Sequence, residues 1–343
     1  MKKFFAVIGN PPYQEESSGE QKNFAPPIYN SFMDEAYKVA EKVTLVTPAR
    51  FLFNAGSTPK KWNEKMLADK HLKVLKYVAD GSTIFPNTDI KGGVAVTYRD
   101  ESKDYGAIGT FTAFEELNGI LRKVRISQVE SLMDDIFIQI RFNLNELFTK
   151  YPKSKKNIGS DGKDSRFEKN IFTKVSEVFS DEKKNSDDIK VLGIVDNKRN
   201  WKFVSRKLVD LNHANLSKYK VLVPTSNGSG SFGEVLSTPV IGKPFVGFTR
   251  SFIGIGKFDT EKEAESCLKY VKTKFLRTML GVLKITQDNN RDSWKYVPLQ
   301  DFTSKSDIDW TKSVHEIDLQ LYKKYGLSKE EKDFIETHVK EMV

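Results

Sequence analysis

The stretch that decides the fold is Phe4-Phe5-Ala6-Val7-Ile8-Gly9-Asn10-Pro11-Pro12-Tyr13. Phe4 to Ile8 is a continuous apolar run that ends at a turn signal, which predicts a strand buried on both faces. The two prolines fix φ and remove two backbone donors, and Asn10, which precedes a proline, is held extended. The turn therefore presents carbonyl oxygens that no local amide can claim.

The segments after this turn alternate between strand and helix patterns. Apolar spacing predicts helices over residues 27–42 and 57–70, and strands over residues 43–48, 72–79 and 94–98. This alternation is typical of a parallel α/β sheet, which could end in an antiparallel pair. The sequence thus predicts a first domain of the α/β class over residues 1–104.

The character of the chain changes after Asp104. Residues 105–189 are expected to be a connecting helical and polar region, in which the charge-mixed stretch 151–188 is an exposed insertion or linker. Residues 190–343 are expected to form a mixed α+β domain. In it, a long helix starts at the capping box of Thr260 and Glu263, and the last two helices are split at Gly326.

The positive charge of the chain is regional. The formal net charge is +9, and residues 190–300 carry 19 Lys+Arg against 9 Asp+Glu. Such an excess indicates a face that binds a polyanion, although a solvated lysine-rich surface gives the same count. The candidate DNA-binding cations chosen from this region are Lys220, Arg250, Lys257, Lys284 and Arg291.

Several classes of protein are excluded by composition. The single cysteine, Cys267, excludes a disulfide framework and a cysteine-built zinc site, and it fits the reducing cytoplasm. The four histidines never fall at metal-ligand spacing, so no metal site is expected. No apolar run approaches the ~20 residues that cross a bilayer.

The turn at Asn10 suits one particular chemistry. The Asn10 side-chain oxygen and the Pro11 carbonyl can accept both hydrogens of an exocyclic amine, which directs the nitrogen lone pair toward an electrophilic methyl group. Tyr13 adds a flat face on which a base can stack. The alternative is a rigid turn at a strand end, but ligands of open α/β sheets bind at such strand ends, which favours a site.

At these residues the chain resembles the adenine-N6 DNA methyltransferases, and most closely the methylase part of bifunctional type II restriction–modification enzymes. Residues 5–13 are similar to motif IV of that family, and residues 43–51 to its next core strand. Residues 84–94 resemble the motif VIII region, where Phe85 sits at the position of an aromatic that packs on the flipped adenine. Residues 219–224 and 275–284 resemble its target-recognition domain.

The resemblance implies a fold and a set of site residues. Residues 1–104 would be the second half of a Rossmann-like methyltransferase sheet, and residues 190–343 the target-recognition domain. Asn10, Pro11, Pro12 and Tyr13 would form the catalytic turn, with Tyr13 and Phe85 stacking on the base. The implied substrate is double-stranded DNA, and the implied cofactor is S-adenosylmethionine.

The cofactor motif of the family is missing from the expected place. Only nine residues precede Asn10, so a glycine-rich strand and turn cannot lie on that side. Downstream, Gly228-Ser229-Gly230-Ser231-Phe232-Gly233 matches G-x-G-x-x-G, but Pro239 and Pro244 follow it where a helix would have to start. We therefore expect a second polypeptide, or a second copy, to cover the unpaired edge of the Phe4–Ile8 strand.

Two other functions stay open from the sequence. The chain could be a DNA-recognition (specificity) module or gene fragment without activity of its own, as the missing cofactor motif suggests. It could also methylate RNA or a protein glutamine, because similar Asn-Pro-Pro-Tyr turns occur in such enzymes.

Overall fold

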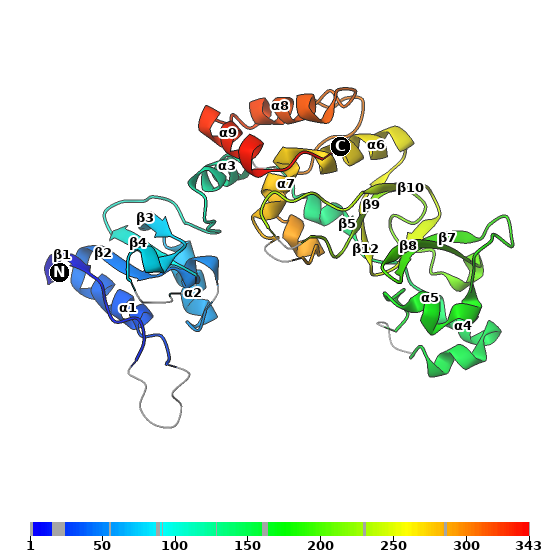
Figure 1. Cartoon of the computed structure of the whole chain (residues 1–343), viewed down its shortest axis with the longest axis horizontal. Helices are drawn as coiled ribbons and strands as arrows, with labels where there is room; N and C mark the ends of the chain where they lie inside the picture. The colour runs from blue at the N-terminus through cyan, green and yellow to red at the C-terminus, as the bar shows by residue number, and fades with distance from the viewer. Residues whose placement is uncertain are drawn as a thin grey trace. The chain divides into compact units, whose positions relative to one another are not determined.

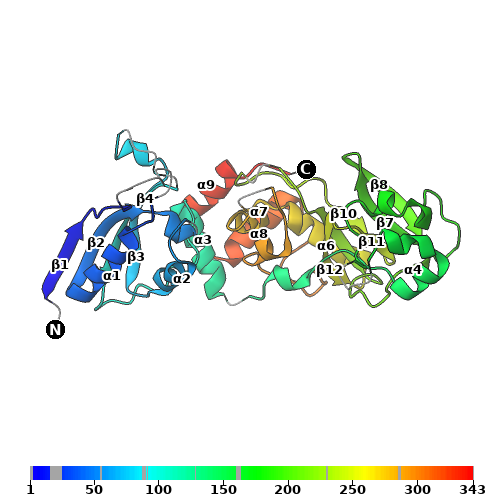
Figure 2. The same cartoon turned by 90° about the horizontal axis from the view of Figure 1, so that it is seen from below.

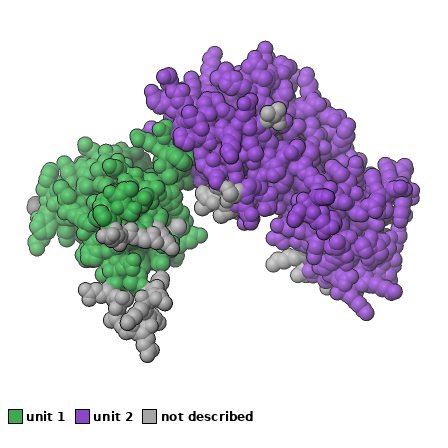
Figure 3. Space-filling view, viewed as in Figure 1, with its two compact units in different colours: residues 1–118 green, residues 119–343 purple. Residues whose placement is uncertain are grey.

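The computed structural model describes residues 3–15, 25–54, 56–86, 90, 92–127, 129–159, 164–228, 231–284 and 287–342. The chain divides into two compact units, residues 1–118 and residues 119–343 (Figure 3). No helix within the described ranges is both long and apolar enough to cross a membrane.

The first unit is built on a mixed four-stranded sheet in the order β1-β2-β4-β3 (Figure 1). Its strands are β1 (Phe4–Gly9), β2 (Ala40–Pro48), β3 (Leu72–Val78) and β4 (Val94–Asp100). β1 runs parallel to β2, whereas β4 is antiparallel to both β2 and β3. The α/β class is confirmed, and the parallel part of the sheet is the β1–β2 pair.

The core of this unit lies between the sheet and two helices. The helices α1 (Tyr29–Val39) and α2 (Lys60–Ala68) pack their apolar residues on the face of β2 that carries Val43 and Leu45. Trp62 meets Tyr29 and Phe51 edge-on inside this core, with the Phe51 and Trp62 ring centroids 5.3 Å apart, and the Tyr29 and Phe51 rings are tilted against each other. Burying one such side chain contributes about 1.5–3 kcal/mol, so this cluster fixes both helices over the strand.

β1 lies at the edge of the sheet (Figure 2). The strand was predicted correctly, but its burial on both faces was not, because Phe4, Phe5 and Ile8 are 49%, 69% and 83% exposed. Within the described residues β1 pairs with β2 alone, so no strand pairs with its second edge.

The second unit contains two further four-stranded sheets. One has the order β10-β9-β12-β5 and is antiparallel throughout, and the other has the order β11-β7-β8-β6. The strands are β5 (Ile136–Phe137), β6 (Phe179–Ser180), β7 (Ile189–Val195), β8 (Lys198–Val204), β9 (Tyr219–Pro224), β10 (Val240–Gly242), β11 (Val246–Phe248) and β12 (Phe252–Phe258). The helices are α3 (Glu115–Ile126), α4 (Leu144–Lys150), α5 (Ile171–Lys174), α6 (Glu261–Lys272), α7 (Lys274–Gly281), α8 (Val314–Lys324) and α9 (Lys329–His338).

The stretch 151–188 is a folded part of this unit, and its prediction as an exposed linker was wrong. Phe167, Ile171, Phe172 and Val175 from this stretch are buried in one core with strands β7 and β8. Because many charged residues lie between these apolar positions, the average composition of the stretch does not show that it has a buried face.

The helices of the C-terminal region begin where the local signals predicted. The Thr260 and Glu263 capping box starts α6, and a second capping box at Ser328 starts α9 after Gly326, which has φ 61°. The long helix expected from Thr260 is in fact two helices. Thr273 is extended, with φ −61° and ψ 148°, and its hydroxyl accepts a hydrogen bond from the Leu276 amide, which begins α7.

Candidate active site

The turn from Asn10 to Tyr13 leaves the sheet directly after β1. Asn10 is exposed, and within the described residues neither its side chain nor the Pro11 carbonyl makes a hydrogen bond. The chain is held on the far side of the prolines, where the Ile28 amide donates to the Tyr13 carbonyl at 3.2 Å. The turn is therefore anchored to the start of α1, and its oxygen acceptors remain available.

Tyr13 meets Phe85, the second aromatic assigned to base stacking. Their ring centroids lie 6.3 Å apart with the planes at 83°, so the edge of one ring faces the other. The Tyr13 hydroxyl is buried and has no hydrogen-bond partner in the part of the chain that the structure describes. Burial also raises the pKa of Tyr13 above its ordinary value. A buried polar atom without a partner is uncommon and marks a place where a ligand group could bond.

Phe85 follows β3 at the end of a short 3₁₀ turn, Gly81–Thr83. Asp80 caps this turn, because its carboxylate accepts from the Ser82 amide at 3.0 Å, and the Phe85 amide donates to the Gly81 carbonyl at 2.9 Å. These bonds place the Phe85 backbone at the same edge of the sheet as the turn after β1. Four positions of the predicted motif VIII segment, residues 87–89 and 91, lie outside the described residues.

A backbone hydrogen bond at Gly93, a glycine with positive φ, links the start of β4 to the residue after β2. The Ala49 amide donates to the Gly93 carbonyl at 2.9 Å, and Pro48 is opposite Val94. Gly93 has φ +78°, and a Cβ added there would lie 2.4 Å from the Val78 carbonyl oxygen. Only glycine fits this position, which brings the ends of β2, β3 and β4 together.

Arg50 is a residue of this edge that sequence reasoning missed. It is the first residue of a 3₁₀ helix, Arg50–Phe53, just after β2, and it is exposed. Its stem contacts Gly56 and Gly92, and no ion pair or hydrogen bond of its guanidinium occurs within the described ranges. The sequence offered one signal for Arg50: a cation two residues after the predicted strand end at Pro48. The glycines that make room for its stem, Gly56 and Gly92, lie further along the chain.

Two of the predicted DNA-binding cations are buried, and the structure corrects their assignment. The Lys220 side chain is fully buried and donates to the Leu216 and Val246 carbonyls at 3.2 and 2.9 Å. Lys284 is 6% exposed and pairs with Glu234 at 2.6 Å. Neither ammonium group can reach a DNA phosphate from these positions.

The other three predicted cations are at the surface, and each lies beside a carboxylate. Arg250 pairs with Glu168 at 3.1 Å. Lys257 lies 3.8 Å from Asp135, and Arg291 lies 3.5 Å from Asp134. Exposed pairs of this kind contribute about 0–1 kcal/mol, so a phosphate can replace the carboxylate at little cost.

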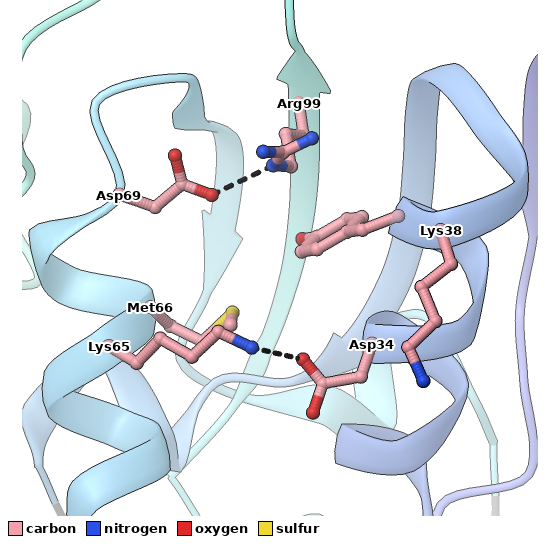
Figure 4. Close-up of a pocket in the computed structure, with 7 residues that line it drawn as sticks. Asp34, Lys38, Lys65, Met66, Asp69 and Arg99 are labelled. Atoms are coloured by element: carbon pink, nitrogen blue, oxygen red, sulfur yellow. Dashed lines mark hydrogen bonds and ion pairs between the residues drawn. The ribbon is translucent and has the colours of Figure 1, made fainter. Parts of the chain in front are cut away.

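A separate pocket of about 400 Å³ opens between α1, α2 and β4 (Figure 4). Arg99 pairs with Asp69 at 2.8 Å, and Lys65 pairs with Asp34 at 2.7 Å. Arg99 is opposite Val43 near the start of β2, whereas Asn10 follows β1 at the other end of the parallel pair. The first pair joins the end of α2 to the sheet and the second joins α2 to α1, and the pocket lies away from the turn.

No group of three or more side chains with metal-binding atoms occurs among the residues that the structure describes. Cys267 is fully buried, and burial raises the pKa of its thiol far above the ordinary value. It is one of the buried residues of α6, and a buried thiol of this kind is a poor nucleophile.

The family model and the curated relative of this chain both describe methylases. Residues 1–85 match the family model of the Eco57I restriction-modification methylases. A Mycoplasma pneumoniae (strain ATCC 29342 / M129 / Subtype 1) protein described as an uncharacterized adenine-specific methylase is 24% identical over 186 residues, which are 54% of this chain and 39% of that protein. The crystal structure of the type IIG restriction endonuclease BpuSI aligns with 91% of this chain and 49% of its own, at 9% identity and a TM-score of 0.34.

The chain therefore spans less than half the length of either relative. The resemblance to the adenine methylases of restriction–modification systems, which the sequence predicted, is confirmed by the family match over residues 1–85 and by the curated relative.

Proposed function

We propose that this chain is the catalytic-turn and target-recognition part of a site-specific DNA adenine-N6 methyltransferase of a restriction–modification system. The target adenine would be flipped out of the duplex and held at the Asn10–Tyr13 turn. The observation that carries this proposal is the unbonded pair of acceptors at Asn10 and Pro11 beside the Tyr13–Phe85 contact.

The two oxygen acceptors would hold the exocyclic amine of the adenine. When both N–H groups are donated to Asn10 and Pro11, the nitrogen lone pair is drawn out of conjugation with the ring. The amine then becomes a better nucleophile without prior loss of a proton. Because the prolines and the bond to Ile28 fix the turn beforehand, little reorganisation is needed when the base enters.

The aromatic pair has to change when the base binds. Perpendicular rings with centroids 6.3 Å apart leave no room for a purine between them. We propose that the adenine stacks on the face of Tyr13 and that Phe85 moves to contact its edge. Stacking of a base on an aromatic ring contributes about 1–3 kcal/mol, which offsets part of the few kcal/mol that flipping costs.

S-adenosylmethionine would supply the electrophilic methyl group. The described residues of this chain do not fit the glycine-rich strand–turn–helix that holds it in the resembled family. Gly228 and Gly233 are followed by strands β10, β11 and β12, and no helix begins in the described residues between Gly233 and α6.

The free edge of β1 supports the proposal of a partner. Phe5 and Ile8 are largely exposed there, and an uncovered apolar edge strand readily pairs with another chain. We propose that a second polypeptide, or a second copy of this chain, pairs along β1 in the cytoplasm. The cofactor site would then lie on that partner, next to the turn.

DNA would be bound by the second unit through surface cations such as Arg250, Lys257 and Arg291. Phosphate binding of this kind releases counterions, so affinity for duplex DNA should fall steeply as salt rises. A flat salt dependence of binding, measured by fluorescence anisotropy with a labelled duplex, would contradict this part of the proposal.

The decisive experiment is methylation in a host that lacks N6-methyladenine. The chain is expressed alone and together with the polypeptides encoded beside it, and N6-methyladenine in the host DNA is measured by mass spectrometry. We expect the modified base in the co-expression, and its loss when Asn10→Ala is introduced into this chain. The proposal is wrong if no N6-methyladenine forms, or if the Asn10→Ala variant still produces it.

A recognition module without activity is the second candidate, and the missing fit for the cofactor favours it. Calorimetry with S-adenosylmethionine separates the two readings once a partner is present. Heat of binding to the complex supports the enzyme, whereas DNA binding without cofactor binding supports the recognition module.

A further inference from the structure

Arg50 lies at the same edge of the sheet as the catalytic turn. It follows β2 by two residues, and β2 is the strand next to β1, which ends at Gly9, directly before Asn10. The bond from the Ala49 amide to the Gly93 carbonyl places it beside the end of the loop that carries Phe85. Arg50, the turn and Phe85 therefore border one region.

Two glycines confine the aliphatic stem of Arg50. A Cβ added to Gly92 would lie 2.5 Å from Arg50 Cγ, and one added to Gly56 would lie 3.2 Å from Arg50 Cβ. Both glycines have positive φ, +86° and +93°, which other residues rarely adopt. A confined stem loses less conformational freedom when the guanidinium binds a ligand.

Arg50 is an exposed residue, and its guanidinium makes no ion pair or hydrogen bond within the described residues. The other arginine of residues 1–118, Arg99, pairs with Asp69 at 2.8 Å. The surface arginines Arg250 and Arg291 also lie beside carboxylates. Arg50 thus combines a confined stem with an unused set of five N–H donors, which suits a phosphate brought by a ligand.

We propose that Arg50 binds the phosphate of the nucleotide whose adenine occupies the Asn10–Tyr13 turn. This inference rests on the proposed function and adds to it the residue that holds the backbone of the flipped nucleotide. A flipped nucleotide rotates about its own backbone, so its phosphate stays at the rim while the base enters the pocket. A fixed arginine at the rim would hold the rotated nucleotide in place while the turn holds the amine.

The test compares two small probes that differ only in the phosphate, adenosine and 5′-AMP. Binding of each to the full chain is measured by ligand-observed NMR or calorimetry at low salt. We expect 5′-AMP to bind about fivefold tighter than adenosine, as for one charge-assisted contact at an exposed site. In Arg50→Gln this preference should disappear while adenosine affinity stays within about twofold, and Arg50→Lys should keep part of the preference.

The matched control is Lys61→Gln, which removes an equally exposed positive charge on α2 and should leave the preference unchanged. Equal binding of both probes to the wild type overturns the assignment of Arg50 and leaves the proposed adenine pocket standing. Equal weakening of both probes by Arg50→Gln, with a lowered melting temperature, shows a structural role and also overturns it. Binding of neither probe overturns the adenine pocket itself, and the inference falls with it.

Discussion

The buried ammonium of Lys220 offers a direct test of the second unit. Its side chain lies inside the protein, where it donates to the carbonyls of Leu216 and Val246 and pairs with no carboxylate of the residues that the structure describes. Burial lowers the pKa of Lys220 from 10.5 to about 7. The unfolded chain therefore keeps this proton up to about pH 10.5, whereas the folded chain starts to release it near pH 7.

The change in the free energy of unfolding with pH follows from the shift in the pKa of Lys220. A pKa difference of about 3.5 corresponds to roughly 5 kcal/mol, at about 1.4 kcal/mol per unit of pKa. We therefore expect the buried charge to reduce the free energy of unfolding by about 5 kcal/mol below pH 7, where both states hold the proton, relative to pH above 10.5. Because the unfolded chain binds more protons above pH 7, the wild type should regain this stability between about pH 7 and 10.5.

The perturbation is Lys220→Met, which keeps the stem and removes the titrating group. Urea unfolding of wild type and variant is followed by tryptophan fluorescence at about pH 6.5 and about pH 10, since Trp201, Trp294 and Trp310 lie in residues 119–343. The two carbonyls lose their donor in the variant at both pH values, so that cost cancels in the difference. We expect the wild type to gain about 4 kcal/mol more than Lys220→Met between the two conditions.

The control for this experiment is Lys218→Met, two residues earlier at the surface, where the lysine pairs with Asp259. Its pH profile should follow that of the wild type. Parallel profiles for wild type and Lys220→Met would show that the ammonium is not buried, and the reasoning from the structure would be refuted.

Three further predictions concern single positions. Asn10→Asp keeps the size of the side chain but adds a charge, so methyl transfer in the co-expression assay should fall about 100-fold or more while affinity for duplex DNA stays unchanged; equal methylation would remove Asn10 from the mechanism. Burial raises the pKa of Asp318 to about 6, so the folded state holds this proton more strongly and stability should fall as pH rises from about 4 to 6. Asp318→Asn should flatten this profile in urea titrations, and an unchanged slope would contradict the burial of the carboxyl. Ile8→Lys places a charge on the free edge of β1, so any concentration-dependent rise of the sedimentation coefficient seen for the wild type should be abolished; a rise that persists would place the contact elsewhere.

Local signals in the sequence were sufficient for most helices and strands of the first unit and for the start of two helices in the second. The capping boxes at Thr260 and Ser328 act through neighbouring backbone amides, so their positions can be read without a tertiary structure. The break at Thr273 was missed because an apolar face continues across it, and the hydroxyl that caps α7 gives no periodic signal.

Burial was harder to predict because it depends on distant segments. The apolar run of β1 predicted a strand, but whether a neighbour covers each edge is decided by the whole sheet. Lys284 is buried because Glu234, fifty positions away in the chain, lies beside it. For Lys220 a local warning did exist, since it lies in β9 among buried apolar residues, where a surface cation is unexpected.

The site itself was predicted as separate residues, and the structure brings Tyr13 and Phe85 into contact. Arg50 could not have been found in the same way. Its confinement needs Gly56 and Gly92, one of which is forty-two positions further along the chain.

The free edge of β1 also affects how the purified protein will behave. Lys42 lies 4.5 Å from the centre of the Phe5 ring, and Lys3 lies 5.6 Å from that of Phe4, so ammonium groups shield the two exposed rings. Positive charges beside an apolar edge oppose aggregation by mutual repulsion, and salt weakens that repulsion because the Debye length shortens to ~10 Å at 0.1 M. High-salt buffers used to strip nucleic acid from a preparation would therefore also promote precipitation through β1.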